Sequence, residues 1–243
     1  MARDRGIEDI ESRNGNLLEL VSQTIQKKNR VRILEAGCGH GVAMMGLIKR
    51  FGASVEVIGF NLNRRHGTVS LMKSQAVKKG LFTATELKDI KLPQIVYCDA
   101  SSKLPFPSNY FDFIYSQSAV YLFDDKINFF QECNRILTVG GIARLSPGFG
   151  SLPAPKGNRG NPTGIEIWDN GAIVSARGYI GKLPGVSIVN APTGVHYLQI
   201  TKTKKLNFKL RFVTAIDYNY IWSEWAGVKS IYTTQLDFRP HWK

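Results

Sequence analysis

Short apolar runs recur along the first 150 residues, and each is followed by a polar or glycine-containing turn. Continuous runs of four to seven mostly apolar residues are typical of strands buried on both faces of a parallel sheet. The stretches between them have the spacing of helices, most clearly Val42 to Arg50 and Lys126 to Leu137. This alternation predicts an α/β fold: a doubly wound, mostly parallel sheet of the Rossmann-like kind with helices on both faces. The predicted strands are residues 33–36, 55–60, 94–98, 112–117 and 142–146.

An amphipathic stretch precedes the first strand. It predicts one or two helices over residues 1–30, with a break at Asn14-Gly15-Asn16. Such a helical cap either covers one face of a cleft or simply packs against the sheet, and the sequence leaves both interpretations open. Its apolar positions are Ile7, Ile10, Leu17, Leu18, Val21 and Ile25.

The chain changes character beyond residue 146. Residues 147–164 are rich in proline and glycine, which predicts a long loop. Loops of that length inside a compact domain are usually functional or disordered, so this one is a candidate lid. Residues 195–202 and 206–213 alternate apolar with polar side chains and predict strands, with a turn at Lys204-Lys205. Residues 165–243 are therefore expected to form a β-rich, aromatic C-terminal elaboration that completes the sheet.

The turn after the first strand is the strongest candidate for a binding site. Residues 35–41 read E-A-G-C-G-H-G, and a predicted helix follows at once. Glycine at every second position leaves no Cβ between the backbone and a nucleoside, and it allows positive φ angles. The free N–H groups at the helix start suit a carboxylate or phosphate. A dinucleotide fingerprint would need a glycine at position 42, which is Val42. Glycine-rich turns also occur without any ligand.

Polar or small residues end the next three strands. Asn61-Leu62 follows the second strand, Asp99-Ala100 the third, and Ser116-Gln117 closes the fourth. In a doubly wound sheet, ligands lie across the carboxyl ends of the strands where the strand order reverses. These residues are therefore expected to meet at one edge with the glycine turn. An alternative for Asn61 is that it caps the following helix.

Three motifs together resemble class I S-adenosylmethionine (SAM) dependent methyltransferases, in particular the small-molecule, type 11-like branch. They are E-x-G-x-G-x-G at 35–41, L-P-F-x-x-x-x-F-D-x-I-x-S at 104–116, and a helix that carries Phe129, Glu132 and Arg135 before Gly140-Gly141. The resemblance covers about half of the chain, roughly residues 31–146. The N/D-P-P-Y motif of enzymes that methylate base amines or glutamine side chains is missing from the end of the fourth strand.

The resemblance implies a SAM-binding core over residues 31–146 and S-adenosylhomocysteine as product. It assigns a ribose-bridging acid to the position of Asn61, where this chain has a neutral amide. Similar non-acidic strand ends occur in branches related to sterol, terpene and fatty-acyl carbon methyltransferases. It also places Asp99 against the adenine amino group. The residues expected to bind the cofactor are Glu35, Gly37, Cys38, Gly39, Gly41, Asn61, Leu62, Asp99, Ala100, Ser116 and Gln117.

Methyl transfer from a sulfonium is an in-line displacement of an activated leaving group, so positioning and desolvation supply much of the rate. A base is needed only if the acceptor must lose a proton. Tyr121 and His196 are the candidate catalytic residues, with Tyr121 suited to orienting the acceptor because a tyrosine is a poor base. A packed or surface histidine is the alternative for His196. The acceptor is expected to be a small molecule that is methylated on oxygen, nitrogen or carbon.

The chain carries 32 Lys and Arg against 19 Asp and Glu, a net charge of +13. Such a charge is typical of nucleic-acid binding, but here the Lys and Arg residues are dispersed along the sequence. An RNA or protein methyltransferase is therefore the alternative, and the neutral Asn61 keeps open a SAM-binding partner subunit without catalysis. No metal site is expected. The three cysteines and the lack of a leader or membrane-spanning run favour a cytoplasmic protein. A homo-oligomer is compatible with the sequence.

Overall fold

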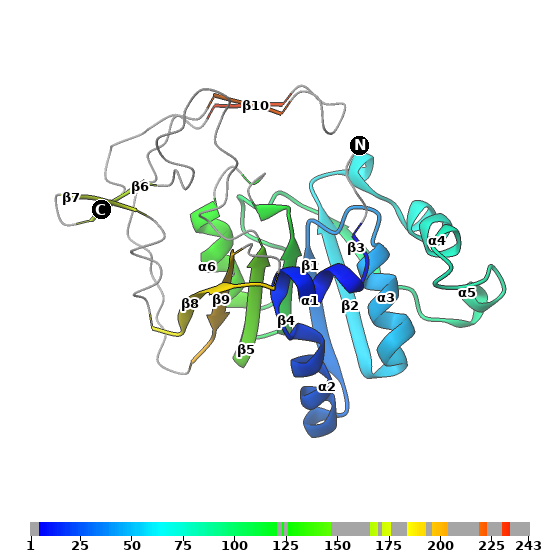
Figure 1. The fold of residues 1–243 in the computed structure, drawn as a ribbon. Coiled ribbons are helices and arrows are strands. Elements are labelled where there is room, and N and C mark those ends of the chain that lie inside the picture. The colour runs from blue at the N-terminus through cyan, green and yellow to red at the C-terminus, as the bar shows by residue number, and fades with distance from the viewer. Residues whose placement is uncertain are drawn as a thin grey trace.

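A computed structural model describes residues 5–120, 123, 126–146, 166–169, 172–175, 184–192, 196–203, 219–222 and 230–233. Its centre is a sheet of seven strands, β1 to β5 with β8 and β9 (Figure 1). The predicted strand at 206–213, the turn at Lys204-Lys205 and the loop at 147–164 lie outside the described residues. No helix among the described residues has the length and apolar character needed to cross a membrane.

The sheet has the order β3-β2-β1-β4-β5-β9-β8. Its first five strands are parallel, whereas β9 runs antiparallel to both of its neighbours. The chain steps outward from β1 through β2 to β3 and then returns to β4 on the other side of β1, so the strand order reverses between β1 and β4. The doubly wound sheet predicted from the sequence is confirmed. The strands are β1 (Val31–Ala36), β2 (Val55–Asn61), β3 (Gln94–Tyr97), β4 (Phe111–Gln117), β5 (Leu137–Ser146), β8 (Val186–Asn190) and β9 (His196–Thr201).

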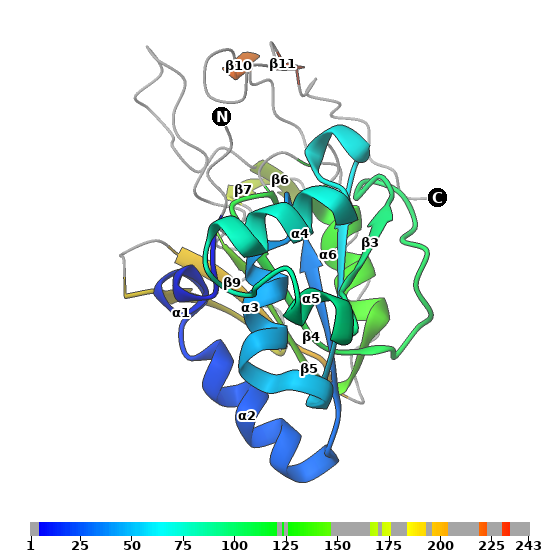
Figure 2. The same cartoon turned by 90° about the vertical axis from the view of Figure 1, so that its right-hand side faces the viewer.

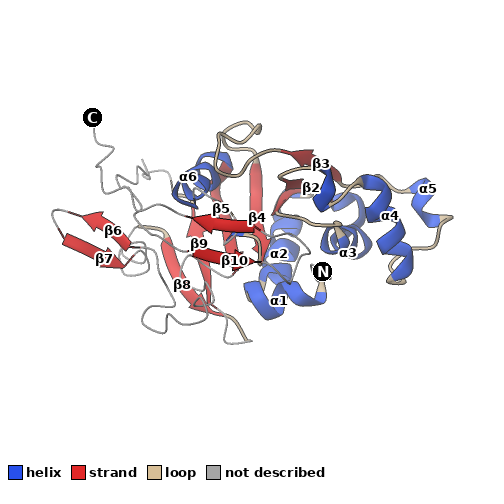
Figure 3. Cartoon of the chain, turned by 90° about the horizontal axis from the view of Figure 1, so that it is seen from above, coloured by secondary structure: helices blue, strands red, loops and turns tan. Residues whose placement is uncertain are grey.

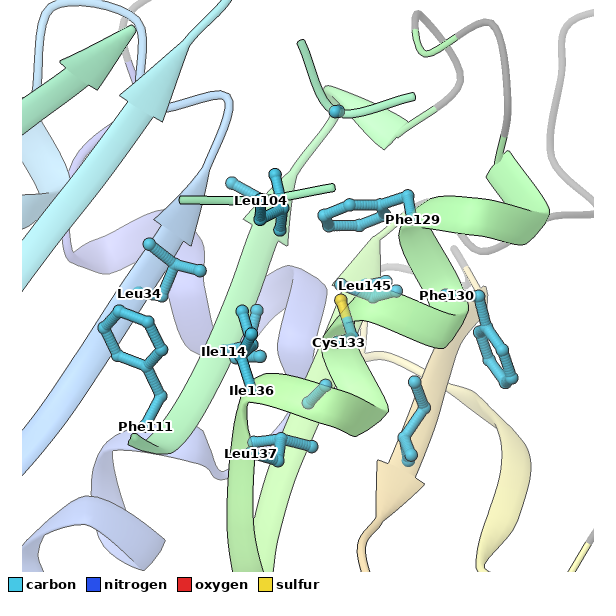
Figure 4. Packing of buried hydrophobic residues seen from close by; sticks show 14 of the residues in the cluster. Leu34, Leu104, Phe111, Ile114, Phe129, Phe130, Cys133, Ile136, Leu137 and Leu145 are labelled. Atoms are coloured by element: carbon cyan, nitrogen blue, oxygen red, sulfur yellow. The ribbon is translucent and has the colours of Figure 1, made fainter. Parts of the chain in front are cut away.

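Helices cover both faces of this sheet, as Figures 2 and 3 show. On one face, α1 to α3 pack on a cluster that includes Ile33 and Phe113, and on the other α6 packs on a cluster that includes Leu34 and Ile114 (Figure 4). Side chains of consecutive strand residues point to opposite faces, which is why these neighbours belong to different clusters. The helices are α1 (Glu8–Asn14), α2 (Leu17–Lys28), α3 (Val42–Phe51), α4 (Val69–Lys78), α5 (Glu86–Asp89) and α6 (Lys126–Ile136), with 3-10 turns η1 (Gly52–Ser54) and η2 (Arg64–His66).

Burial explains why the apolar runs predicted the central strands. Every residue of β4 is buried, as expected for a strand covered on both faces. Its one charged residue, Asp112, lies at the amino end, where it accepts hydrogen bonds from Lys28 Nζ at 2.6 Å and from the Arg32 amide at 2.9 Å. A buried carboxylate needs such partners.

The junction between α6 and β5 differs from the sequence prediction. The helix ends at Ile136 and the strand begins at Leu137, five residues earlier than expected. Lys202 explains the difference, because its Nζ donates to the carbonyl of Leu137 and its own carbonyl accepts from the Gly140 amide at 2.7 Å. Partners on the β9 side therefore extend β5 through the two glycines, with a shift of register against β4 between Phe111 and Phe113.

The C-terminal elaboration contains more strands than were predicted. β9 confirms the strand expected at 195–202, while β8, which pairs with it, was missed. Two hairpins form separate two-stranded sheets, β6 (Glu166–Asp169) with β7 (Ala172–Ser175), and β10 (Asn219–Trp222) with β11 (Ser230–Thr233).

Candidate cofactor site

The turn between β1 and α3 has the backbone that its glycines predict. Gly37, Gly39 and Gly41 all have left-handed φ angles, of 69°, 52° and 73°. Gly37 is also needed for packing, because a Cβ at this position would lie 2.2 Å from the Cβ of Ala119, in the segment after β4. The turn is therefore packed against the end of β4, at the point where the strand order reverses.

Asn61, at the end of β2, is hydrogen-bonded to the centre of this turn. Its Oδ1 accepts from the Gly39 amide at 2.9 Å, and its Nδ2 donates to the Gly39 carbonyl at 2.9 Å. The alternative that Asn61 caps the next helix is wrong, because Asn63 accepts from the Arg65 amide in η2 and Thr68 caps α4. We call these two hydrogen bonds the Asn61–Gly39 bridge. A ribose contact by Asn61 stays a prediction.

Four buried polar side chains lie side by side beneath α1, at the carboxyl ends of β1, β4 and β5. Glu35 is opposite Tyr115 in the register of β1 and β4, and Gln117 is opposite Ser146 in that of β4 and β5. Each is less than one-tenth exposed. Within the described part of the chain, Glu35 Oε2, Tyr115 OH, both amide atoms of Gln117 and Ser146 Oγ have no hydrogen-bond partner outside this group, although Tyr115 and Gln117 lie close enough to Glu35 to interact with its carboxyl. Buried polar atoms without partners are rare, and a ligand or ordered water usually satisfies them.

Burial dominates the electrostatics of this polar cluster. It raises the pKa of Glu35 from 4.5 to about 8, although the neighbouring Tyr115 and Gln117 side chains act in the opposite direction. The same burial, followed by the charge of Glu35, raises the pKa of the Tyr115 hydroxyl well above its usual 10. The Tyr115 hydroxyl therefore stays protonated, so it can donate a hydrogen bond but does not act as a base. A cation next to Glu35 would stabilise its ionised form.

The other predicted cofactor residues are found in three different settings. The Ser116 hydroxyl donates to the Ala36 carbonyl at 3.0 Å, so it already has an internal partner. Asp99 is exposed and its Oδ1 accepts from the Ser101 amide, while Ala100 beside it is buried. Leu62 is 58% exposed at the end of β2. The Cys38 thiol is buried, which raises its pKa well above 9.

The two predicted catalytic residues are less well defined. Tyr121 lies outside the described residues. His196 is described only in its backbone, at the start of β9, where it pairs with Asn190. β9 runs antiparallel to β5, and Leu198 is opposite Leu145. Two residues before Leu198, His196 therefore lies just past Ser146, at the same carboxyl edge as the glycine turn. Both assignments stay predictions. The described residues contain no group of three or more His, Cys, Asp or Glu side chains able to hold a metal ion.

Sequence reasoning missed the residues that attach α1 to this edge. Asn14 donates to the Arg144 carbonyl at 2.9 Å, and Arg144 Nη1 donates to the Asn14 carbonyl at 2.6 Å. Arg144 also donates to Asn16 at 3.1 Å and to Gln199 at 2.8 Å, and its guanidinium lies over the Tyr197 ring. The available signal was an arginine inside the otherwise apolar run at 142–146, because buried charges need dedicated partners.

Comparison with known proteins identifies the central part of the chain. Residues 34–145 match the family described as "Methyltransferase domain". Residues 34–145 form a methyltransferase domain. It belongs to the SAM-dependent class that the motifs indicate, and it contains all eleven predicted cofactor residues. No curated protein matches the chain.

One solved structure shares the fold of the methyltransferase domain, and others resemble it more distantly. A Methanococcus maripaludis protein described as a SAM-dependent methyltransferase is 16% identical, with a TM-score of 0.50, over 86% of this chain and 100% of that one. A SAM-dependent methyltransferase from Aquifex aeolicus is 15% identical over 79% and 90%, with a TM-score of 0.46. A Galdieria sulphuraria protein described as a sarcosine dimethylglycine methyltransferase is 24% identical over 53% and 45%, with a TM-score of 0.39. The chain spans about half the length of several matched structures, the Galdieria protein among them.

Proposed function

We propose that the protein transfers a methyl group from SAM to an oxygen, nitrogen or carbon of a small molecule. The observation that carries this proposal is the set of buried, unpartnered polar atoms on Glu35, Tyr115, Gln117 and Ser146 beside the glycine turn. The methionine part of SAM has an ammonium and a carboxylate, which match acceptors and donors of these kinds. The ammonium would also compensate the buried charge of Glu35.

The residues around this cluster have roles that their chemistry supports. Glu35 would hold the ammonium, with the amide of Gln117 and the hydroxyl of Ser146 beside it. Asp99 accepts hydrogen bonds and suits the adenine amino group, while the exposed apolar side chain of Leu62 suits one face of the ring. When bound, SAM supplies a methyl group on a positively charged sulfur. The protein then has to orient the acceptor and exclude water.

The position of α1 indicates where a methyl acceptor would bind. α1 lies over the carboxyl ends of β4 and β5, and it is attached there through Arg144 and by Arg13, which donates to the Ser118 hydroxyl at 2.7 Å. We propose that residues 1–30 cap the acceptor site, that 147–164 gate it, and that Tyr121 and His196 face the acceptor. The free thiols of Cys38, Cys98 and Cys133 fit a reducing compartment such as the cytoplasm.

One observation favours the alternative of an RNA acceptor. Between Leu62 and Gly80, next to the glycine turn, the chain carries five basic residues and no acidic one. All five are exposed: Arg64, Arg65, Lys73, Lys78 and Lys79. An unbalanced basic surface attracts a phosphate backbone, although this segment has no Phe, Tyr or Trp to stack on a base and only His66 has an aromatic ring.

Transfer of a radiolabelled methyl group from SAM into a cell lysate tests both candidates. The products are divided into organic-soluble, acid-soluble and acid-precipitable fractions, the last with and without nuclease. We expect label in the soluble fractions. Nuclease-sensitive label in the precipitate would replace the small-molecule proposal with the RNA one. SAM binding without label in any fraction would contradict both.

A further inference from the structure

The Asn61–Gly39 bridge has a chemical requirement that the usual acid at this position cannot meet. The amide accepts from the Gly39 N–H and donates to the Gly39 carbonyl, each over 2.9 Å, and Asn61 is only 3% exposed. An ionised carboxylate has acceptors only. It would satisfy the N–H but would place an anionic oxygen against the carbonyl oxygen. A protonated carboxyl has both a donor and an acceptor and could replace the amide.

Besides Asn61, the Cys38 thiol donates to the Gly39 carbonyl, at 3.8 Å, and a thiol is a weak donor. Gly67 lies directly against this carbonyl, since a Cβ at position 67 would come within 1.9 Å of its oxygen. Gly67 is in turn held by Tyr97, whose hydroxyl donates to the Gly67 carbonyl at 2.9 Å. The end of β2, the segment before α4 and the end of β3 thus converge on one peptide of the glycine turn. Without the amide donor this part-buried carbonyl would have only the weak thiol donor, and a carbonyl left without a donor costs about 1–3 kcal/mol when it is fully buried.

We propose that Asn61 is a positioning residue that fixes the Gly39 peptide for SAM binding, and that it needs the amide's donor as well as its acceptor. This inference rests on the proposed function, because the ligand whose affinity it controls is SAM. Its distinctive consequence concerns pH. A ribose-binding acid works when it is ionised, whereas an acid in the Asn61–Gly39 bridge works only when it is protonated.

The test compares Asn61→Asp with the parent chain by calorimetric titration of SAM between about pH 5.5 and about pH 8.5. We expect Asn61→Asp to bind on the order of tenfold or more weakly than the parent at the high end. The ratio of the two affinities should approach one at the low end, where the carboxyl is protonated. Affinity equal to or above that of the parent at high pH would overturn the inference, because it would mean that the side chain binds ribose as an acid.

Asn63→Asp is the matched control, two residues further along. Asn63 is exposed, and its Oδ1 accepts from the Arg65 amide at 2.9 Å. An aspartate supplies that acceptor equally well, so SAM affinity should stay within about twofold of the parent at every pH. A pH-dependent loss in Asn63→Asp that matches the loss in Asn61→Asp would trace the effect to added charge and would overturn the inference.

Thermal unfolding without SAM separates this inference from the proposed function. The bridge raises the folded-state pKa of an aspartate at position 61 above its unfolded value of about 3.9. Asn61→Asp should therefore approach the parent's stability at low pH and lose stability as pH rises through that raised pKa. If the difference in stability between Asn61→Asp and the parent stayed constant as pH rises through this pKa, the bridge would be refuted. Absence of SAM binding by the parent would instead refute the proposed function and leave the unfolding result valid.

Tyr97→Phe provides a second variant in case Asn61→Asp does not fold at any pH. It removes the hydroxyl that holds Gly67 against Gly39 and leaves Asn61 intact. We expect SAM affinity to fall about threefold to tenfold, with the same ratio to the parent at every pH. Unchanged affinity would mean that the position of the Gly39 peptide does not limit binding, which would overturn the inference.

Discussion

Glu35→Gln tests the electrostatics of the buried polar cluster directly. Glutamine keeps the size of the side chain but cannot ionise. Because burial raises the pKa of Glu35 from 4.5 to about 8, ionising it in the folded protein costs about 5 kcal/mol more than in the unfolded chain. Because the folded-state pKa of Glu35 lies above its unfolded value, the folded protein is most stable at low pH, where Glu35 is protonated in both states. It loses stability as pH rises through about 8.

The size of the effect follows from the same two values. At about pH 7 the unfolded chain has already released the proton and the folded chain has not, which removes about 3 kcal/mol from the parent relative to about pH 4. For a chain of this length, 3 kcal/mol corresponds to about 6–12 °C in the unfolding temperature. Glu35→Gln should not show this loss. Any cost of the glutamine itself is independent of pH and cancels when the two pH profiles are compared.

The assay is chemical or thermal unfolding of both proteins from about pH 5 to about pH 9, with and without SAM. SAM should reduce the parent's loss of stability at high pH, because its ammonium lowers the pKa of Glu35. SAM affinity of the parent should rise toward pH 8, and that of Glu35→Gln should change little. Parallel stability profiles for the two proteins would refute the reasoning, since they would show that Glu35 titrates alike in the folded and unfolded chains.

Three further predictions concern packing and backbone. Gly39→Arg should abolish SAM binding measured by calorimetry while circular dichroism shows an intact fold, and unchanged affinity would contradict the site. Gly37→Ala should destabilise by about 2 kcal/mol or more, and adding Ala119→Gly should recover part of that loss in denaturant unfolding, because the two Cβ atoms would otherwise lie 2.2 Å apart. Arg144→Met should speed amide hydrogen exchange in α1 at least tenfold relative to α3, and equal protection in the parent and variant would exclude Arg144 as its anchor.

Local patterns predicted the parts of this fold that are determined by local burial. The strands β1 to β4 were predicted within two residues because each is a short, mostly apolar run, and β1, β2 and β4 are also buried over nearly their whole length. The eleven cofactor residues were assigned from the glycine spacing, from the rule that ligands meet the carboxyl edge and from the resemblance to methyltransferases, and they stay a prediction. β8 was missed because Val186–Asn190 is short and becomes a strand only through pairing with β9.

The interactions that make the site specific depend on contacts between distant segments. Glu35 and Tyr115 are 80 residues apart, and only the register of β1 against β4 places them together. Asn61 was assigned to the ribose from its place at a strand end and from the acid that the resemblance implies there, whereas its two hydrogen bonds depend on the conformation of Gly39. The early start of β5 depends on Lys202, which reaches across from β9.

The attachment of α1 has a consequence for synthesis of the chain. The helix leaves the ribosome before the arginine that holds it, which is 130 residues further along the chain, and that arginine depends in turn on Gln199 from β9. Non-local contacts of this kind form late, because a long loop must close first. Until Arg144 and Gln199 have both been synthesised, α1 therefore lacks this polar attachment to the sheet. Slower translation between Asn14 and Gln199 would prolong this interval.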